Sequence, residues 1–178
     1  VYRIPLKGKM VMRIAICDDE EYFLDVLSDL VKDNTDTAAI DKFTSADQLL
    51  ASDHNYDIIF LDIEMRGMNG IEAADKLRER FPLIGQAPLL IFVTSYKGYL
   101  LDEFDGNAYN FLLKPVDPKK FRTVFSRACT LLKTIALQED VLLVKMPNGA
   151  SYRLDRSHIR YIESTGSRIN IYTLDGEI

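Results

Sequence analysis

Apolar and polar positions alternate along this chain in blocks that predict strands and helices in turn. Residues 58–61 and 89–93 are apolar at every position, which is typical of strands buried on both faces of a sheet. Shorter or less regular apolar blocks predict further strands at 14–17, 38–43 and 110–113. Between the blocks, apolar side chains recur every three or four residues, as on the buried stripe of a helix. The pattern therefore predicts five strands that alternate with helices.

This alternation also predicts how the elements are joined. Strands that are linked by helices run parallel and connect by right-handed crossovers, so that helices cover both faces of the sheet. The longest helical stripe starts at an N-cap and first-turn pair, Asp117 and Pro118, and a shorter helix is predicted around Leu100. We expect an α/β fold with a five-stranded, doubly wound parallel sheet, followed by a partial all-β segment.

Polar side chains with related chemistry follow four of the five predicted strands. Asp18 and Asp19 follow the first strand, Asp62 the third, Thr94 the fourth and Lys114 the fifth. The carboxyl ends of parallel strands meet at one edge of the sheet, where ligands bind in open α/β folds. Crowded carboxylates raise one another's pKa unless a cation lies among them, and hard oxygen ligands of this kind suit Mg²⁺. The sequence therefore predicts a magnesium site at this edge.

The same set of residues suggests phosphoryl chemistry. Asp62 can act as an acceptor nucleophile that forms an aspartyl-phosphate, while Mg²⁺ and Lys114 neutralise the charge on the transferring group. The Thr94 hydroxyl can donate a hydrogen bond to a phosphate oxygen. Each residue alone has an ordinary structural explanation, because acids and hydroxyls cap helices and lysines lie on surfaces. Their joint placement at the strand ends favours the functional interpretation.

Composition and charge narrow the class of protein. The chain has 178 residues, 47% of them apolar, and lacks both a run long enough to span a membrane and a leader-like start, so we expect a soluble cytoplasmic protein. Residues 1–11 carry three basic side chains and resemble an extension outside the domain. The two cysteines, Cys17 and Cys129, fit reduced core residues, and His54 and His158 are too far apart in sequence to suggest zinc.

Residues 12–137 strongly resemble the receiver domain of two-component response regulators. The resemblance rests on Asp18, Asp19, Asp62, Thr94 and the Lys114–Pro115 pair with its preceding Phe111. It implies that a sensor histidine kinase phosphorylates Asp62, and that no enzyme activity toward an external substrate is present.

The resemblance also implies a role for each matching residue. Asp19 would bind the metal directly, Asp18 through water, and the backbone carbonyl of Glu64 would complete the protein's ligands. Lys114 would pair with the phosphoryl group. Thr94 and Phe111 would form a switch pair, which we expect to favour a homodimer on phosphorylation. The Lys114–Pro115 bond would be cis.

After residue 140 the pattern changes to short strands at 141–145, 151–154 and 168–173. This segment, 141–178, resembles the start of a LytTR-type DNA-binding domain, and Ser167 and Arg168 fall in the region of that family's first DNA-contacting loop. Asp175 and Gly176 form a good hairpin turn, but the returning strand is missing. The segment carries five basic and four acidic residues, so we expect DNA binding through a complete domain and weak or absent binding by this chain.

Two alternatives remain at this stage. The first is a stand-alone receiver or interaction module whose tail does not bind DNA. The second is a Mg²⁺-dependent phosphatase of the haloacid dehalogenase type, which also uses an aspartate after an apolar strand. In that family the nucleophile lies on the first strand and the acidic pair comes late, the reverse of the order found in this sequence.

Overall fold

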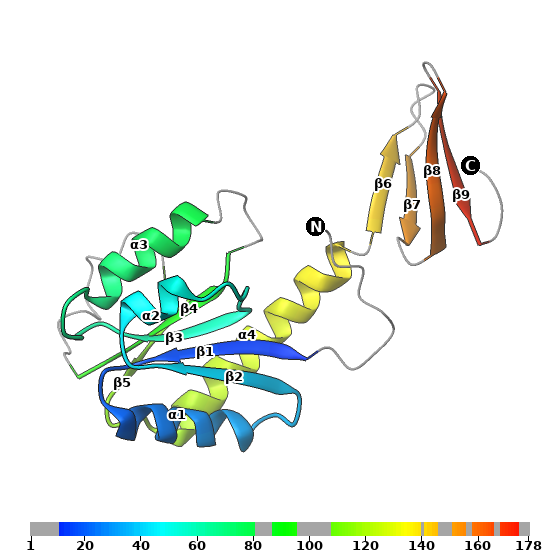
Figure 1. Cartoon of the computed structure of the whole chain (residues 1–178). Coiled ribbons are helices and arrows are strands. Elements are labelled where there is room, and N and C mark those ends of the chain that lie inside the picture. Colours follow the sequence, from blue (N-terminus) through cyan, green and yellow to red (C-terminus); the bar gives the residue numbers. More distant parts are fainter. Residues whose placement is uncertain are drawn as a thin grey trace. The chain divides into compact units, whose positions relative to one another are not determined.

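The computed structural model describes residues 11–80, 87–95, 108–139, 141–145, 151–155, 158–165 and 168–174. The chain divides into two compact units, with the boundary after Thr130. The larger, N-terminal unit holds a five-stranded sheet and the smaller, C-terminal unit holds short antiparallel strands (Figure 1). No helix in the described part of the chain is long and apolar enough to cross a membrane.

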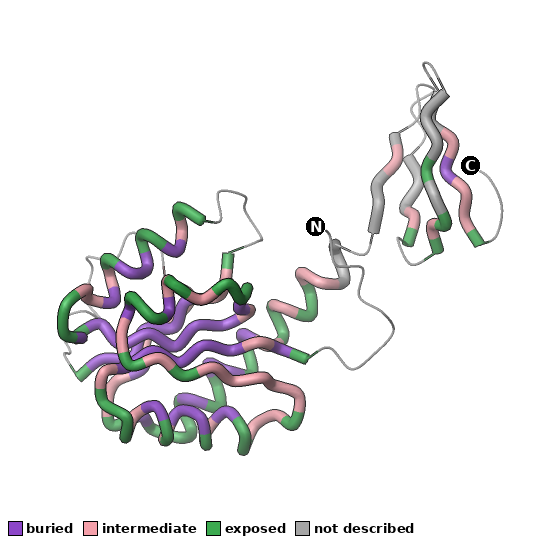
Figure 2. Tube along the Cα trace, in the orientation of Figure 1, coloured by how far each residue is buried: buried purple, intermediate pink, exposed green. Residues whose placement is uncertain are grey.

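All five strands of the sheet run parallel, as the sequence predicts. Their order is β2-β1-β3-β4-β5, which places β3 at the centre. The strands are β1 Met12–Cys17, β2 Ala38–Phe43, β3 Ile58–Asp62, β4 Leu89–Thr94 and β5 Asn110–Leu113. Every residue of β3 is buried, because helices cover the sheet on both sides (Figure 2). The doubly wound parallel fold expected from the alternating pattern is therefore confirmed.

Helices lie on both faces of the sheet. The elements are α1 Glu21–Lys32, α2 Ala46–Ala51, α3 Gly70–Arg80 and α4 Pro118–Glu139, with α2 and α3 on one side and α1 and α4 on the other (Figure 1). On the first face, Ile59 and Phe92 pack with Leu49 of α2 and Leu77 of α3. The short helix predicted around Leu100 lies outside the described residues.

On the second face, Phe60 of β3 joins the sheet to α4. Its ring stacks on that of Phe121, with 5.4 Å between ring centroids, and Phe121 stacks in turn on Phe125 at 5.5 Å. These two α4 residues are four apart, so their rings project from the same side of the helix. The buried stripe read from the sequence therefore packs against the centre of the sheet.

Side-chain caps start three of the described helices, whereas α1 has no side-chain cap at its N-cap residue Glu20. Ser45 accepts a hydrogen bond from the Gln48 amide at the start of α2, and Asp117 accepts one from the Lys119 amide at the start of α4, as predicted. Asn69 caps α3 and accepts from the amides of Ile71 and Glu72, both at 2.9 Å. The cap at Asn69 was not predicted from the sequence.

The C-terminal unit is built from two antiparallel pairs. Strand β6 (Val141–Lys145) pairs with β7 (Ser151–Asp155), and β8 (Ile159–Thr165) pairs with β9 (Arg168–Thr173). The sequence predicted three of these strands and missed β8, because charged side chains interrupt its apolar alternation. The predicted turn at Asp175 and Gly176 lies outside the described residues.

Candidate functional site

The acids predicted to meet at the carboxyl edge of the sheet do lie together. Asp18 and Asp19 follow β1, and Asp62 is the last residue of β3. One carboxylate oxygen from each lies within 4.8 Å of the others. Asp18 and Asp62 are buried, whereas Asp19 is partly exposed. Two of the three negative charges are therefore held out of water.

Lys114, the first residue after β5, is the cation at this site. Its Nζ lies 2.8 Å from Asp18 Oδ2 and donates a hydrogen bond of 3.0 Å to Asp62 Oδ2. Glu20 is farther away, at 3.8 Å, and largely exposed. The Lys114 side chain is only 3% exposed, so one buried ammonium group is shared between two buried carboxylates.

Backbone amides satisfy other oxygens of the three aspartates. The Glu20 amide donates to Asp18 Oδ1, the Glu64 amide to Asp62 Oδ1 and the Arg66 amide to Asp19 Oδ2. Asp18 Oδ2 is different: it is buried and, despite its close ion pair with Lys114, has no partner with hydrogen-bond geometry. A buried oxygen of this kind is costly unless a further group binds it.

The electrostatics follow from burial and charge. Burial, followed by the charge of Asp18, raises the pKa of Asp62 to about 6, although the bond from Lys114 opposes the shift. Burial also raises the pKa of Asp18. Burial alone would lower the pKa of Lys114, but its ion pair with Asp18 and its bond to Asp62 outweigh that effect and raise it. The lysine therefore stays charged between two carboxyl groups that bind protons more readily than usual.

Cys17, at the end of β1, lies beside this acidic site. Burial and the charges of Asp18, Asp62 and Asp19 raise the pKa of its thiol to about 12. Its sulfur lies 3.6 Å from that of Met65. Cys17 is therefore a neutral core thiol, as expected from the sequence.

This set of oxygens fits a hard divalent cation. Three carboxylates converge within 4.8 Å and one buried carboxylate oxygen lacks an aligned donor. Mg²⁺ is bound in proteins through one or two carboxylates with further oxygens from water and phosphate. Asp18, Asp19 and Asp62 could hold such an ion, and its charge would offset the repulsion that Lys114 balances only in part.

The remaining predicted residues surround this centre. Thr94 is fully buried at the end of β4, and its carbonyl accepts a hydrogen bond from the Lys114 amide. Phe111 of β5 is partly buried and stacks on Phe92 of β4, with 5.5 Å between ring centroids. The Lys114–Pro115 peptide bond is cis.

Two neighbours of the site were missed in the sequence analysis. Gly70 starts α3 so close to β3 that a Cβ at this position would collide with the carbonyl oxygen of Asp62. The ring of Phe23 lies over Lys114, with 4.1 Å between Nζ and the ring centroid. Both contacts join residues that are distant in sequence, so no local pattern could have revealed them.

The predicted DNA-contacting residues lie in the C-terminal unit. The backbone of Arg168 begins β9 and pairs with Thr165 of β8. Ser167 lies outside the described residues. The role of both in DNA binding stays a prediction.

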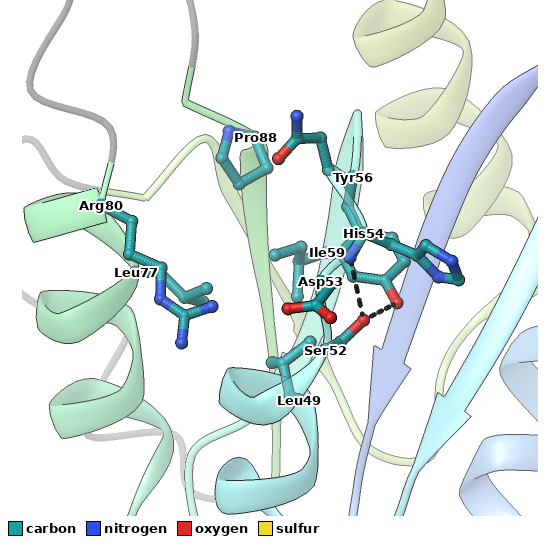
Figure 3. A pocket seen from close by; sticks show the side chains of 10 residues that line it. Leu49, Ser52, Asp53, His54, Tyr56, Ile59, Leu77, Arg80 and Pro88 are labelled. Atoms are coloured by element: carbon teal, nitrogen blue, oxygen red, sulfur yellow. Dashed lines mark hydrogen bonds between the residues drawn. The ribbon is translucent and has the colours of Figure 1, made fainter.

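The hollow shown in Figure 3 is separate from the acidic site. It has a volume of about 260 Å³ and lies between α2 and α3, near the amino ends of β3 and β4. Its floor includes Leu49 and Leu77, and its rim includes Asp53, His54 and Arg80. It therefore opens at the edge of the sheet opposite Asp62.

Comparison with known proteins places this geometry in a family. A profile of the family described as response regulator receiver domain matches residues 14–126. The sensory transduction protein LytT of Oceanobacillus iheyensis is 29% identical over 174 residues, which cover 95% of this chain and 70% of that protein. LytT of Enterococcus faecalis is 31% identical over 119 residues, covering 66% of this chain and 48% of that protein.

A third relative is the transcriptional regulatory protein BtsR of Salmonella typhi. It is 25% identical over 168 residues, covering 93% of this chain and 63% of BtsR. The chain thus spans between about half and 70% of the length of these three relatives.

Solved structures share the fold. The response regulatory domain of mrkE from Klebsiella pneumoniae has a TM-score of 0.61 at 22% identity, over 69% of this chain and 99% of that chain. The response regulator TrrA from Thermotoga maritima, in complex with Mg²⁺ and BeF, has a TM-score of 0.57 at 24% identity, over 66% of this chain and 98% of that chain.

Proposed function

This chain belongs to the response regulator receiver family and is a two-component response regulator of the LytTR type, and from that premise we propose that Asp62 is its phosphoacceptor. One observation carries the proposal: Asp62 ends the central strand beside two further aspartates and a buried lysine. No other arrangement of acids in the described part of the chain combines these features. A sensor histidine kinase is the donor.

The chain's own residues account for each part of the transfer. An Asp62 carboxylate oxygen attacks the phosphorus of the kinase phosphohistidine, the phosphorus–nitrogen bond breaks, and the departing imidazole nitrogen takes up a proton. Lys114 is already 3.0 Å from Asp62 Oδ2, so a modest movement of its ammonium group would place it on a phosphoryl oxygen. Burial of the site keeps water away from the product.

Asp18, Asp19, Asp62 and the carbonyl of Glu64 are the proposed Mg²⁺ ligands. Bound Mg²⁺ supplies positive charge that offsets both the crowded carboxylates and the oxygens of the phosphoryl group. The buried Asp18 Oδ2, which lacks an aligned donor, supports this assignment.

The test is covalent labelling by a small phosphodonor such as phosphoramidate. We expect one phosphoryl group per chain, mapped to Asp62 and dependent on Mg²⁺. Undiminished labelling in excess chelator, or a phosphoryl group on another carboxylate, would contradict the assignment. Steady release of phosphate from external phosphoesters would instead support the phosphatase alternative, which family membership disfavours.

We also propose how the phosphoryl group affects the rest of the protein. Thr94 moves toward the phosphoryl oxygens and Phe111 follows into the space beside β4. This favours a homodimer through the face formed by residues 96–104, β5 and α4, of which 96–104 lie outside the described residues. The stacking of the partly buried Phe111 on Phe92 supports this, because it joins Phe111 to β4, the strand that ends at Thr94. Equal dimerisation constants for phosphorylated and unphosphorylated protein in sedimentation would contradict it.

Residues 12–137 form the proposed receiver, and 141–178 the first part of a LytTR-type DNA-binding domain. A complete domain of this type would connect phosphorylation to transcription. For this chain we propose weak, poorly specific DNA binding, because its C-terminal segment has nearly balanced charge and offers few phosphate contacts. Nanomolar binding at physiological salt that distinguishes a sequence from its scramble would contradict this.

A further inference from the structure

The Lys114 ammonium group has one neighbour that carries no charge. The Phe23 ring, in the first turn of α1, lies 4.1 Å from Nζ, while the carboxylates of Asp18 and Asp62 lie at 2.8 and 3.0 Å. The face of an aromatic ring attracts a cation, most strongly where water is excluded. With a Lys114 side chain only 3% exposed, this contact is largely desolvated.

We propose that Phe23 is a positioning residue that holds Lys114 in the site while Asp18 and Asp62 change partners. This inference rests on the proposed function of Asp62. Both short contacts of the lysine are made to oxygens that metal binding and phosphorylation would engage. The Phe23 ring binds neither metal nor phosphoryl group, so its attraction for the ammonium group persists when the aspartate oxygens bind Mg²⁺ or accept the phosphoryl group.

Phe23 has one further backbone contact and one further ring contact. The Phe23 amide donates a 3.0 Å hydrogen bond to the carbonyl of Glu20, directly after the acidic turn. The Tyr22 ring meets the Phe23 ring edge to face, with centroids 5.3 Å apart at 70°. Glu20, the remaining negative neighbour of Lys114, is farther from Nζ at 3.8 Å and 63% exposed. The ring is therefore the best placed constant anchor for the lysine.

The proposal is tested first by side-chain NMR of Lys114 in the 178-residue protein, with Mg²⁺ alone as the probe. Ring currents from Phe23 should shift the Lys114 ε-methylene signals upfield, and the shift should persist when Mg²⁺ is added. In Phe23→Leu we expect the signals to move toward those of an exposed lysine on adding Mg²⁺. Signals that lose their upfield shift in the unsubstituted protein with Mg²⁺ would overturn the proposal, whether or not Asp62 accepts phosphate.

The second measurement is the rate of phosphoramidate labelling of Asp62. A desolvated cation–π contact implies about a ten-fold slower rate for Phe23→Leu, whereas Phe23→Trp should remain within about three-fold of the original. Phenylalanine analogues of increasing fluorination at position 23 keep the shape of the ring and weaken its attraction for cations. These analogues provide the test if Phe23→Leu fails to fold.

The logarithm of the labelling rate should fall steadily along the fluorinated series, with unchanged unfolding temperatures. A rate that is independent of fluorination would show that Phe23 only fills space, and would overturn the positioning role. Failure of the proposed function is recognised separately, because the unsubstituted protein would then not be labelled on Asp62 although the NMR result could still hold.

Discussion

Two groups of carboxylates in the parallel sheet differ in the partners that surround them. On the outer strand β2, one oxygen of Asp41 reaches groups toward the amino edge: it lies within 3.5 Å of Arg13 Nη1, 3.1 Å of His54 Nδ1 and 3.0 Å of the Tyr56 hydroxyl. At the carboxyl edge, two buried aspartates share the ammonium group of Lys114. Asp41 has several polar side-chain partners for one negative charge, whereas the acidic site has two buried carboxylates for one buried cation.

The difference separates a structural acid from a reactive one. The Asp41 carboxylate ties β1 and β2 to the loop before β3 through its contacts with Arg13, His54 and Tyr56. Buried carboxylates that share too few donors raise the free energy of the folded state. That cost decreases when a cation binds or when one carboxylate is phosphorylated. The shortage of donors around buried carboxylates therefore identifies the functional site better than the number of acidic residues does.

The sharpest test of this comparison exchanges one oxygen at each edge. Asp62→Asn should abolish labelling by a small phosphodonor, because the amide is not a nucleophile for phosphorus. Asp41→Asn should leave the labelling rate within about two-fold, since its side-chain partners lie away from the acidic site. It should cost about 1 to 3 kcal/mol of unfolding free energy through its lost charge. Phosphoprotein electrophoresis and urea unfolding measure the two effects. Loss of labelling in Asp41→Asn would break the distinction.

A second test concerns the backbone behind Asp62. Gly70→Ala should destabilise the protein by at least about 3 kcal/mol, because the new Cβ would collide with the Asp62 carbonyl oxygen and lie 3.0 Å from Ile63 Cα. Gly67→Ala is the matched control. It has a positive φ of 81° but open space around it, so strain alone should cost about 1 kcal/mol. Similar urea midpoints for the two variants would contradict the close-packed account.

A third test follows the proton on Asp62. Its pKa of about 6 lies above the ordinary aspartate value of 3.8, so the folded state binds this proton more tightly than the unfolded state. The contribution of Asp62 to stability is therefore greatest below pH 4 and is lost as the pH rises from about 4 to about 6, by up to ~3 kcal/mol.

Asp62→Asn removes that loss. In chelator at pH 7.5 we expect the variant to be more stable than the original by about 1 to 2 kcal/mol, and at pH 3.5 to show no such gain. Thermal unfolding at both pH values measures this, and Mg²⁺ should restore stability to the original protein at pH 7.5. If Asp62→Asn were less stable than the original at pH 7.5, the ionised Asp62 would not be destabilising the folded protein, which would contradict this prediction.

The smallest expected effect lies at the amino edge. His54→Gln removes one of several polar neighbours of Asp41, and His54 is largely exposed, so the loss should be at most about 1 kcal/mol. Labelling of Asp62 should not change. Urea unfolding and the labelling rate check both statements, and a labelling defect would mean that the two edges are coupled.

The sequence predicted the functional edge because its signals are local. The apolar run that stops at Asp62 marks the end of a buried strand. In a parallel sheet the carboxyl ends of the other strands lie at the same edge. The partners of Asp41 could not be predicted in this way, since Arg13 lies on β1 whereas His54 and Tyr56 lie in the loop before β3. Gly70 and Phe23 were missed for the same reason, because their importance depends on packing between elements.

The C-terminal strands show another limit of local patterns. Strand β8 carries Arg160 and Glu163 among its apolar residues, so it lacks the alternation that made β9 recognisable. Its pairing with β9 supplies the backbone hydrogen bonds that propensity alone does not predict.

The buried thiol of Cys17 has a consequence for the lifetime of an acyl phosphate. An aspartyl-phosphate is a mixed anhydride, and a neighbouring thiolate could attack its carbonyl carbon, displace phosphate and leave a thioester. With a pKa of about 12, only about one Cys17 side chain in 10⁵ is ionised at pH 7. The charges of the three aspartates thus help to keep the Cys17 thiol protonated. A protonated thiol does not attack the aspartyl-phosphate, so the phosphorylated state is not lost by acyl transfer to Cys17.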